Sequence, residues 1–354
     1  MPAIKLLCLD GDGIGPEIMR ATLKVFEAVR PDLRQAFDIS HGDIGFKALE
    51  RDGTTLPDAV LSSAKASDAV LLGPVSHNTY PPLSEGGLNP SGVLRKELDL
   101  YANIRPAKSW AGLPHPTAKP VDLVVVRENH EGFYADRNMH LGSGEFMPVP
   151  GVALAIRRIT QEASERIAER AFAIAAERPA QKVAAIHKAN VMRVSDGLFL
   201  DVVRGVAAKY PRIAYEEILV DAAAAHLVRS PDRFDVLVTT NMFGDILSDL
   251  ASELAGGLGL AGSLNAGPSH AAGQAQHGSA PDIAGQDRAN PVSLILSLAM
   301  LLRHFAEYEA AGRIETTVGQ LLSDPATRTP DLAGALGTQA FADHVVSLIK
   351  RKAA

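Results

Sequence analysis

Two aspartates at helical spacing are the strongest chemical signal in the sequence. Asp245 and Asp249 lie in a segment where apolar residues recur with a helical period after Asn241. A helix brings side chains four residues apart onto one face, with Cβ atoms roughly 6 Å apart. Two uncompensated charges there cost about 0.2–0.5 kcal/mol. A bound divalent cation would reverse that sign, because Mg²⁺ and Mn²⁺ prefer oxygen ligands. The alternative is a solvated acidic helix face, which the uncharged residues on both sides disfavour.

Polar side chains also follow several apolar runs that have the character of buried strands. Arg127, Lys188, Asp221 and Asn241 each come directly after such a run. In open α/β sheets the ligand crevice lies at the carboxyl ends of the strands. We therefore expect the four side chains to lie close together, although any one of them alone would also fit an ordinary loop position.

Further polar residues indicate an anion site. Arg95 and Arg105 frame a helix-like segment that Pro106 is expected to end, beside a long Pro- and Gly-rich loop at 74–92. Two arginines next to a loop are able to clamp a carboxylate bidentately, and two surface arginines are the alternative. Tyr134 adds an acid close to such an anion site.

The glycine-rich turn near the amino terminus gives only weak evidence for an ordinary dinucleotide fold. A strand at 4–9 leads into Gly11, Gly13 and Gly15, and a helix is expected up to residue 29. The spacing is G-x-G-x-G, and Pro16 stands where the last glycine of G-x-G-x-x-G belongs. The sequence therefore disfavours an ordinary Rossmann site here.

Three more segments are interpreted from their composition. Residues 256–290 are expected to form a loop whose small residues let the backbone approach a flat or phosphorylated ligand, with a plain flexible loop as the alternative. Residues 151–178 predict an amphipathic helix, and 291–303 predict a helix in the core.

Composition limits the class of protein. The 354 residues are enough for two domains or one large doubly wound one, with an ordinary apolar fraction of 46%. A net charge of −6 gives no electrostatic footprint for nucleic acid. No apolar run is long enough to span a membrane, and no signal peptide is recognisable. The single Cys8 excludes internal disulfides and thiolate metal cages, and we expect a protein of the reducing cytoplasm.

Four motifs together resemble the β-decarboxylating dehydrogenases, the isocitrate/isopropylmalate dehydrogenase family. They are GDGIGPE at 11–17, HKAN at 187–190, NMFGDILSD at 241–249 and HGSAPDIAGQDRANP at 277–291. The third motif is highly specific, especially in combination with the second. The resemblance covers essentially the whole chain.

The resemblance implies an α/β isopropylmalate dehydrogenase-like fold, with a large mixed sheet wound by helices and a second, smaller α/β domain, rather than an ordinary Rossmann fold. A discontinuous large domain of residues 1–105 and 258–354 would bind the cofactor. Residues 106–257 would form the smaller domain, which carries dimerisation, metal and the catalytic lysine. Family members are usually homodimers with shared active sites, so Lys188 and Asp221 would enter the partner's site.

The resemblance also assigns roles to individual residues. The catalytic residues would be Tyr134 and Lys188. The metal ligands would be Asp221 of one subunit with Asp245 and Asp249 of the other. The substrate-binding residues would be Arg95, Arg105, Arg127, Asn89 and Ser91. The cofactor-binding residues would be Ile14, Asn190, His277, Gly278, Ser279, Ala280, Pro281, Asp282 and Asn290.

The implied reaction is the oxidative decarboxylation of a 3-substituted D-malate. Mg²⁺ or Mn²⁺ would act as a Lewis acid on the C2 hydroxyl, and Lys188 would take the hydroxyl proton. Hydride would pass to the nicotinamide, CO₂ would leave, and Tyr134 would protonate C3. Asp282 favours NAD over NADP, because a carboxylate accepts hydrogen bonds from both ribose hydroxyls and repels a 2′-phosphate.

The preferred substituent at C3 stays open. Isopropylmalate enzymes carry leucines before the first arginine, whereas this chain has Asn89 and Ser91, the two polar types of isocitrate enzymes in swapped order. His130, where relatives have Thr, has no assigned role. These residues favour a polar C3 group, with tartrate, D-malate and homoisocitrate as alternatives. A non-catalytic regulatory subunit and a metal-free hydroxyacid dehydrogenase are the alternatives of other classes.

Overall fold

The computed structural model describes residues 2–134, 136 and 139–353. The chain divides into two compact units. The first comprises Met1–Asp99, Trp110–Pro114 and Gly257–Ala354, and the second comprises Leu100–Ser109 and His115–Gly256.

The boundary between the units differs from the predicted one near residue 100. Strand β4 (Ala102–Lys108) was expected in the larger domain up to residue 105. It lies instead in the second unit, because it pairs antiparallel with β5 (Asp122–Glu128) over its whole length.

The first unit is built on a mixed sheet in the order β2-β1-β3-β12-β11. The first four of these strands run parallel, and β11 is antiparallel to β12. Their bounds are β1 Ile4–Leu9, β2 Phe37–Gly42, β3 Ala69–Leu72, β11 Gly262–Ala266 and β12 Ala271–Ala275.

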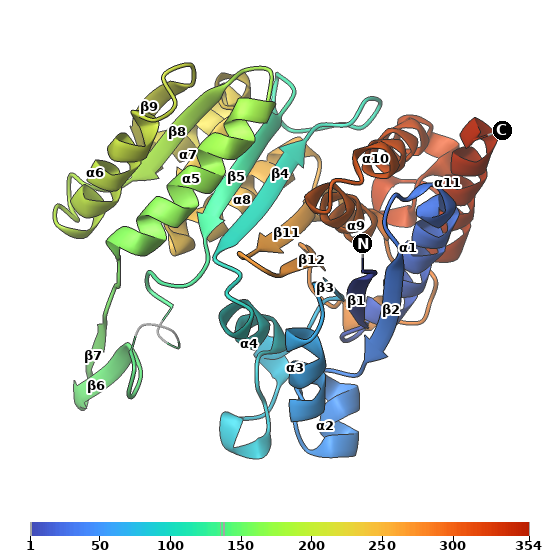
Figure 1. Ribbon diagram of the computed structural model, residues 1–354, viewed down its shortest axis with the longest axis horizontal. Helices are drawn as coiled ribbons and strands as arrows, with labels where there is room; N and C mark the ends of the chain where they lie inside the picture. The colour runs from blue at the N-terminus through green and yellow to red at the C-terminus, as the bar shows by residue number, and fades with distance from the viewer. Residues whose placement is uncertain (1, 135, 137–138, 354) are drawn as a thin grey trace. The chain divides into compact units, whose positions relative to one another are not determined.

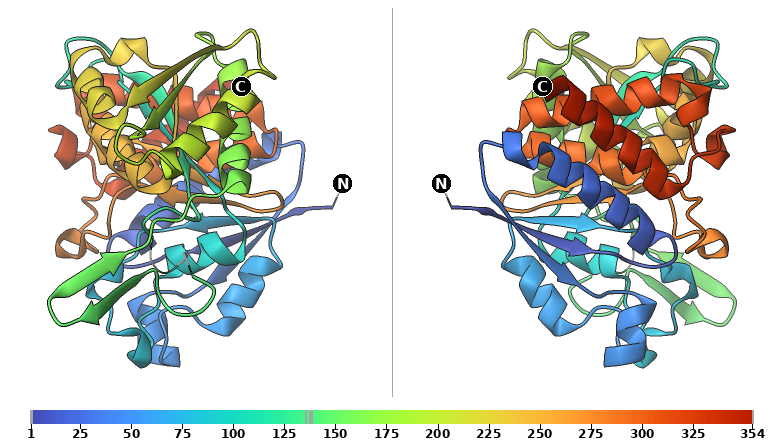
Figure 2. Two further views of the ribbon diagram at one scale, coloured as in Figure 1. Left: turned by 90° about the vertical axis from the view of Figure 1, so that its left-hand side faces the viewer. Right: turned by 90° about the vertical axis from the view of Figure 1, so that its right-hand side faces the viewer.

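The helices of this unit come from both ends of the chain. They are α1 Gly15–Val29, α2 Phe46–Asp52, α3 Asp58–Lys65, α4 Pro90–Glu97, α9 Val292–His304, α10 Tyr308–Ser323 and α11 Thr338–Ala353. Figure 2, right, shows the blue α1 beside the red α11. Gln339 Nε2 donates to the backbone oxygen of Glu17 at 2.9 Å, which joins the two helices.

The interpretation of 256–290 as a loop is wrong for part of this segment, because β11 and β12 lie within it. Both strands run directly beneath α9. A Cβ atom on Gly262 would lie 3.0 Å from the carbonyl carbon of Leu296, and one on Gly273 would lie 2.9 Å from the oxygen of Ser297. So close an approach requires small residues, which have low β propensity and therefore gave no strand signal.

The second unit has a sheet in the order β4-β5-β10-β8-β9, in which all strands after β4 are parallel. Strands β8, β9 and β10 span Lys182–His187, Ala214–Leu219 and Val236–Thr239, and helices α5, α6, α7 and α8 span Gln161–Glu177, Ser195–Ala207, Val220–Arg229 and Asn241–Ala255. Figure 1 shows α5 on one face of this sheet and α7 and α8 on the other. A buried apolar core, including Leu237, Leu247 and Ala251, packs α8 against the strands.

The predicted helix at 151–178 is wrong in its first turns. Helix α5 begins at Gln161 and is capped by Thr160, whose side chain accepts from the N–H of Ala163 at 3.2 Å. The preceding residues form β7 (Val152–Ala155), which pairs with β6 (Glu145–Val149) in a hairpin. The hairpin extends away from the sheet of its unit (Figure 1).

The helix-like segment expected between Arg95 and Pro106 is also wrong in its second half. Helix α4 ends at Glu97, and Asp99 has a left-handed backbone with φ of 49°. The chain then enters β4, so Arg105 and Pro106 are strand residues. Pro106 fits there because a fixed φ is compatible with extended backbone.

In the part of the chain described, no helix combines the length and apolar character that crossing a bilayer requires.

Candidate active site

The carboxyl ends of the parallel strands in the second unit carry the polar residues that the sequence singled out. Thr239 at the end of β10 is in register with Arg127 of β5 and with Ile186 of β8. Lys188 follows β8 directly, and Asn241 is the first residue of α8. The strand pairing therefore delivers these side chains to one edge of the sheet, as the spacing predicts.

Two direct contacts follow from this arrangement. The Arg127 Nε donates to Asn241 Oδ1 at 2.9 Å. Lys188 Nζ donates to Asp221 Oδ1, near the start of α7, at 2.6 Å. The hydrogen bond with Lys188 holds the pKa of the exposed Asp221 carboxyl below its usual value.

Arg127 is the centre of the larger group of contacts. Its side chain is fully buried, with 1% of the residue exposed. One terminal nitrogen donates to Tyr134 Oη at 2.7 Å, and the other donates to Asp245 Oδ1. Tyr134 Oη donates in turn to Asp245 Oδ2 at 2.6 Å, which closes a ring of three polar side chains. This ring fixes the position of the phenol oxygen.

Arg105 supplies a second buried guanidinium to the same helix face. Its Nη1 donates to Ser248 Oγ at 2.8 Å and to Asp249 Oδ1 at 3.0 Å, and it lies 3.5 Å from Asp245 Oδ1. Burial, together with the like charge of Arg127, lowers its pKa to about 10. Among the described residues, the buried Arg105 Nε has no hydrogen-bond partner.

A glycine lets α8 approach this close. A Cβ atom on Gly244 would lie 2.6 Å from both Cβ and Cγ of Arg127. Asn241 secures the start of the same helix by donating from Nδ2 to the backbone oxygen of Glu131 at 3.0 Å. Gly244 is therefore a packing requirement of the site.

Asp245 and Asp249 fit a hard divalent cation. Both carboxylates lie on one face of α8, and their side chains are 40% and 51% exposed. Carboxylate oxygens are the donors that Mg²⁺ and Mn²⁺ prefer. Among the described residues of a single chain, no group of three His, Cys, Asp or Glu side chains could hold a metal ion. Asp245 and Asp249 would therefore need a further ligand for the metal ion from outside these side chains of their own chain.

In the first unit, the residues predicted to read the substrate gather around Gln274. The Ser91 hydroxyl donates to Gln274 Oε1 at 3.0 Å, and Arg95 Nη2 donates to the same oxygen at 3.4 Å. Asn89 instead caps α4, accepting from the N–H of Gly92 at 3.2 Å. Gln274 was missed because it lies on β12, within the segment that the sequence indicated as loop.

The glycine turn is filled by the chain itself. The N–H of Ile14 donates to the oxygen of Ser279 at 2.8 Å. A Cβ on Gly13 would lie 2.0 Å from that oxygen, and a Cβ on Gly11 would lie 2.1 Å from the oxygen of Pro74. These glycines thus serve contacts between chain segments, whereas a Rossmann turn keeps them open for a pyrophosphate.

The segment predicted to bind the cofactor, residues 277–282, has features that fit a polar ligand. The Nε2 atom of His277 is buried without a partner, while Nδ1 lies 2.9 Å from the oxygen of Gly278. Burial lowers the pKa of His277, which favours the neutral ring. Apart from its chain neighbours, no described atom lies within 4 Å of a Cβ built on Gly278. Ala280 has φ of 37° and leads into a short 3-10 helix, Pro281–Ile283, where Asp282 is exposed.

Two other predicted cofactor residues differ in their surroundings. Asn190 is exposed after β8. Asn290 is buried, donating to Asp331 Oδ2 at 2.9 Å and accepting from the N–H of Val292 at 3.0 Å. These bonds hold the start of α9, so a cofactor contact by Asn290 would require them to rearrange.

A buried aspartate that the sequence interpretation passed over organises the loops of the first unit. Asp12 accepts from the N–H of Phe46 at 2.8 Å, from the N–H of Ser76 at 2.9 Å and from the Tyr80 hydroxyl. It thereby ties the 74–92 loop to the glycine turn. The only signal for it was its place inside the GDG motif.

His130 belongs to a turn that leads from Arg127 to Tyr134. Its N–H donates to Glu128 Oε1 at 2.6 Å, and the N–H of Glu131 donates to Glu128 Oε2 at 3.0 Å. Burial raises the pKa of Glu128 to about 7. The structure thus shows how the backbone of His130 is held.

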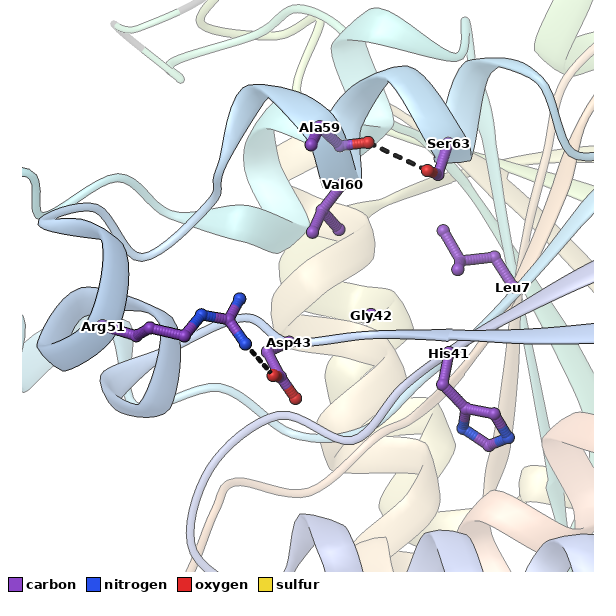
Figure 3. Close-up of a pocket in the computed structure, with 8 residues that line it drawn as sticks. All are labelled: Leu7, His41, Gly42, Asp43, Arg51, Ala59, Val60 and Ser63. Atoms are coloured by element: carbon purple, nitrogen blue, oxygen red, sulfur yellow. Dashed lines mark hydrogen bonds and ion pairs between the residues drawn. The ribbon is translucent and has the colours of Figure 1, made fainter.

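A cavity of about 280 Å³ lies elsewhere in the first unit and contains none of the predicted site residues (Figure 3). It is lined by Leu7, His41, Gly42, Asp43, Arg51, Ala59, Val60 and Ser63. Its Arg51 is paired with Asp43 at 2.5 Å and with Asp52 at 2.7 Å, and Lys47 is paired with Asp43 at 2.8 Å, so two cations balance two carboxylates.

Comparison with known proteins agrees with this geometry. The family model described as isocitrate/isopropylmalate dehydrogenase matches residues 5–345. A 3-isopropylmalate dehydrogenase of Archaeoglobus fulgidus is 45% identical, over 98% of this chain and 99% of the relative. An isocitrate/homoisocitrate dehydrogenase of Thermus thermophilus is 43% identical, over 98% and 99%. The crystal structure of isocitrate dehydrogenase from Methylococcus capsulatus superposes with a TM-score of 0.87 at 42% identity, covering 98% of this chain and 99% of that one.

The predicted α/β fold and dehydrogenase class are therefore confirmed. The motifs, the arrangement of the second unit and the matches over nearly the full length agree: the chain belongs to the isocitrate/isopropylmalate dehydrogenase family of oxidatively decarboxylating dehydrogenases.

Proposed function

We propose that the protein catalyses the NAD- and divalent metal-dependent oxidative decarboxylation of a 3-substituted D-malate. The observation that carries this proposal is the cluster of Arg105, Arg127, Tyr134, Asp245 and Asp249 in the second unit. It combines two buried cations, a fixed phenol and two carboxylates on one helix face. That combination suits a polyanionic substrate bound next to a cation.

Each group then has a task. Arg105 and Arg127 bind the carboxylates of the malate. Asp245 and Asp249, with Asp221 of the partner subunit, would hold Mg²⁺ or Mn²⁺, which as a Lewis acid lowers the pKa of the substrate's C2 hydroxyl. Lys188 of the partner subunit accepts the hydroxyl proton. The Tyr134 hydroxyl, held by its two hydrogen bonds, delivers a proton to C3 after CO₂ has left.

The same chain supports a homodimer with shared sites. The hairpin formed by β6 and β7 exposes a row of apolar side chains: Phe146, Met147, Val149, Val152 and Leu154. Val191 and Val194, just after Lys188, are 69% and 88% exposed. Contiguous apolar patches on a protein surface commonly mark interaction sites. A second copy of this chain would cover them and bring in the missing carboxylate.

NAD is the proposed hydride acceptor. The exposed Asp282 carboxylate suits a ribose that has both hydroxyls free and repels a 2′-phosphate. The unpartnered Nε2 of His277 supplies a buried polar contact nearby in the sequence.

A single buried Cys8 and the absence of other cysteines suit the reducing cytoplasm.

For the substituent at C3 we propose a polar group. The first turn of α4 offers the Ser91 hydroxyl, which donates to Gln274, as Arg95 also does. It does not present the row of leucines expected for an isopropyl group. Isocitrate-type substrates fit this surface better than isopropylmalate does. Homoisocitrate, D-malate and tartrate are the alternatives within the same chemistry.

The test is NADH formation with isocitrate, isopropylmalate, homoisocitrate, D-malate and tartrate, each with Mg²⁺ or Mn²⁺ and with excess chelator. We expect turnover of at least one of them, highest with a polar C3 group and abolished by the chelator. Turnover that survives the chelator would exclude the metal-dependent reaction. A chain inactive on the whole panel would favour the non-catalytic regulatory subunit.

A further inference from the structure

A buried arginine outside the residues described so far joins three parts of the second unit. Arg157 lies between β7 and α5, and only 8% of its side chain is exposed. Its Nη1 atom donates to Asp196 Oδ1 at 2.5 Å and to Ser195 Oγ at 2.8 Å. Its Nη2 atom donates to Thr240 Oγ1 at 3.1 Å. Asp196 is completely buried, so this pair of charges is shielded from water.

The carboxylate of this pair reaches the backbone of Lys188. Asp196 Oδ2 accepts from the N–H of Lys188 at 2.5 Å, while Oδ1 receives Arg157. A single carboxylate therefore binds the arginine on one oxygen and the main chain of the lysine on the other. The side chain of Lys188 starts from a backbone atom that is held in place from inside the protein.

The other end of the guanidinium reaches the segment that carries the aspartates. Thr240 immediately precedes Asn241, where α8 begins. The guanidinium carbon also lies 5.7 Å from the ring centre of Phe243 in the first turn of α8 and 5.8 Å from that of Phe133, the neighbour of Tyr134. Arg157 thus contacts segments next to the lysine, the tyrosine and the aspartates without touching any of those side chains.

Stability alone is a poor reason for such a pair. Burying two charges costs desolvation that their attraction often only balances, and apolar replacements are commonly neutral or stabilising. A planar guanidinium, however, presents donors in fixed directions, which an ammonium does not. The fixed donor directions of the guanidinium therefore explain how Arg157 holds chain segments at a defined separation better than they explain a gain in stability.

We propose that Arg157 and Asp196 form a positioning pair that fixes the backbone of Lys188 and the start of α8 within one chain. The proposal rests on the proposed function, in which Lys188 accepts a proton in the partner's site while α8 carries metal ligands of the chain's own site, so the pair holds two contributions that one chain makes to two sites. Neither residue takes part in the chemistry directly. Loss of the pair should therefore lower kcat and leave the binding of substrate and NAD nearly unchanged.

Arg157→Lys is the direct test, and Arg158→Lys is its matched control. The lysine variant keeps the charge beside Asp196 but cannot span Asp196 and Thr240 together. The neighbouring Arg158 side chain is 51% exposed and lies 3.8 Å from Glu131. We expect Arg157→Lys to lower kcat about 10–100-fold, as misplacement of catalytic groups does, with each KM changed less than about threefold. Arg158→Lys should retain wild-type kcat.

A second readout is independent of activity. Amide hydrogen exchange reports local opening, and the Lys188 N–H is protected by Asp196. Exchange at this amide should rise about tenfold or more in Arg157→Lys, while the strands of the same unit keep their protection. If the wild-type protein turned over no substrate, the proposed function would fail and this measurement would still decide the positioning role.

Two results would overturn the inference. One is unchanged exchange at Lys188 in Arg157→Lys. The other is a loss of kcat that merely parallels a loss of thermal stability. If Arg157→Lys does not fold, Asp196→Asn replaces it, since asparagine still offers one oxygen to the Lys188 N–H but no charge to Arg157. That variant should show the same fall in kcat with KM preserved, and wild-type kcat in it would refute the proposal.

Discussion

Replacement of Gly244 by alanine tests how tightly α8 is packed against the arginine at the centre of the site. The new Cβ atom would lie 2.6 Å from Cβ and Cγ of Arg127, whereas ordinary contacts begin at 3.4 Å. Helix and arginine must therefore separate by about 0.8 Å. Because Arg127 is fully buried and bonded to Asn241, Tyr134 and Asp245, none of these bonds survives the shift unchanged.

Two opposing effects set the size of the stability change. Alanine in a helix interior is favoured over glycine by about 0.5–1 kcal/mol. Overpacking of a well-packed core costs about 1–3 kcal/mol. For Gly244→Ala we expect the second to dominate, which gives a net loss of about 1–2 kcal/mol in the free energy of unfolding. The displacement of Arg127 should also lower kcat by about 10–100-fold, since a shift near 1 Å has that effect on catalysis.

Gly205→Ala is the control for helix propensity. Gly205 lies in α6, and apart from its own stretch of helix no described atom lies within 4 Å of a Cβ built on it. This variant should gain about 0.5–1 kcal/mol and keep full activity. Urea unfolding and steady-state kinetics of the two variants provide the comparison. A Gly244→Ala protein as stable and active as Gly205→Ala would refute the packing argument.

Three further predictions address the proton donor, the cofactor and the thiol. Tyr134→Phe should impair decarboxylation more than hydride transfer, because the phenol oxygen between Arg127 and Asp245 is lost. The two half-reactions are measured separately with the keto acid, and equal loss in both would refute the role of Tyr134 as proton donor. Asp282→Lys combined with Ile283→Tyr should shift the kcat/KM ratio from NAD towards NADP, and an unchanged ratio would show that these positions do not read the ribose. Burial raises the pKa of Cys8 to about 12, so at pH 8–9 the folded protein should resist thiol reagents that modify the unfolded chain, whose thiol ionises near a pKa of about 8.5. The free energy of unfolding that is linked to this thiol is fully present below the pKa of the unfolded chain and is lost as the pH rises towards 12, which unfolding experiments at several pH values would detect. Rapid labelling of the native protein would contradict the burial of Cys8.

The parts of the site that lie in one regular element could be predicted from local pattern. The change from strand to helix period around Asn241 indicated both α8 and the shared face of Asp245 and Asp249. The polar residues after apolar runs indicated the edge of the sheet, because parallel strands present their carboxyl ends together. Arg127 and Lys188 follow from that rule.

The parts that depend on contacts distant in sequence could not be predicted in this way. Strand β12 is made of small residues because α9 lies against it, so its pattern resembled a loop and hid Gln274. Arg105 was placed in a helix, although its pairing with β5 makes it a strand residue. Arg157 and Asp196 lie 39 residues apart, and no local period reveals that their charges meet in the interior.

The central claim is that two chains share each metal site, and it is tested by mixing two inactive variants. Asp221→Asn and Asp245→Asn should each be inactive as homodimers. A mixed dimer would contain one site in which both carboxylates are intact and one site in which both are lost. Random pairing makes half of all dimers mixed, so subunit exchange should restore about a quarter of wild-type NADH formation. No recovery in mixed dimers verified by mass would contradict the shared site, because a site built within one chain would be broken in every subunit.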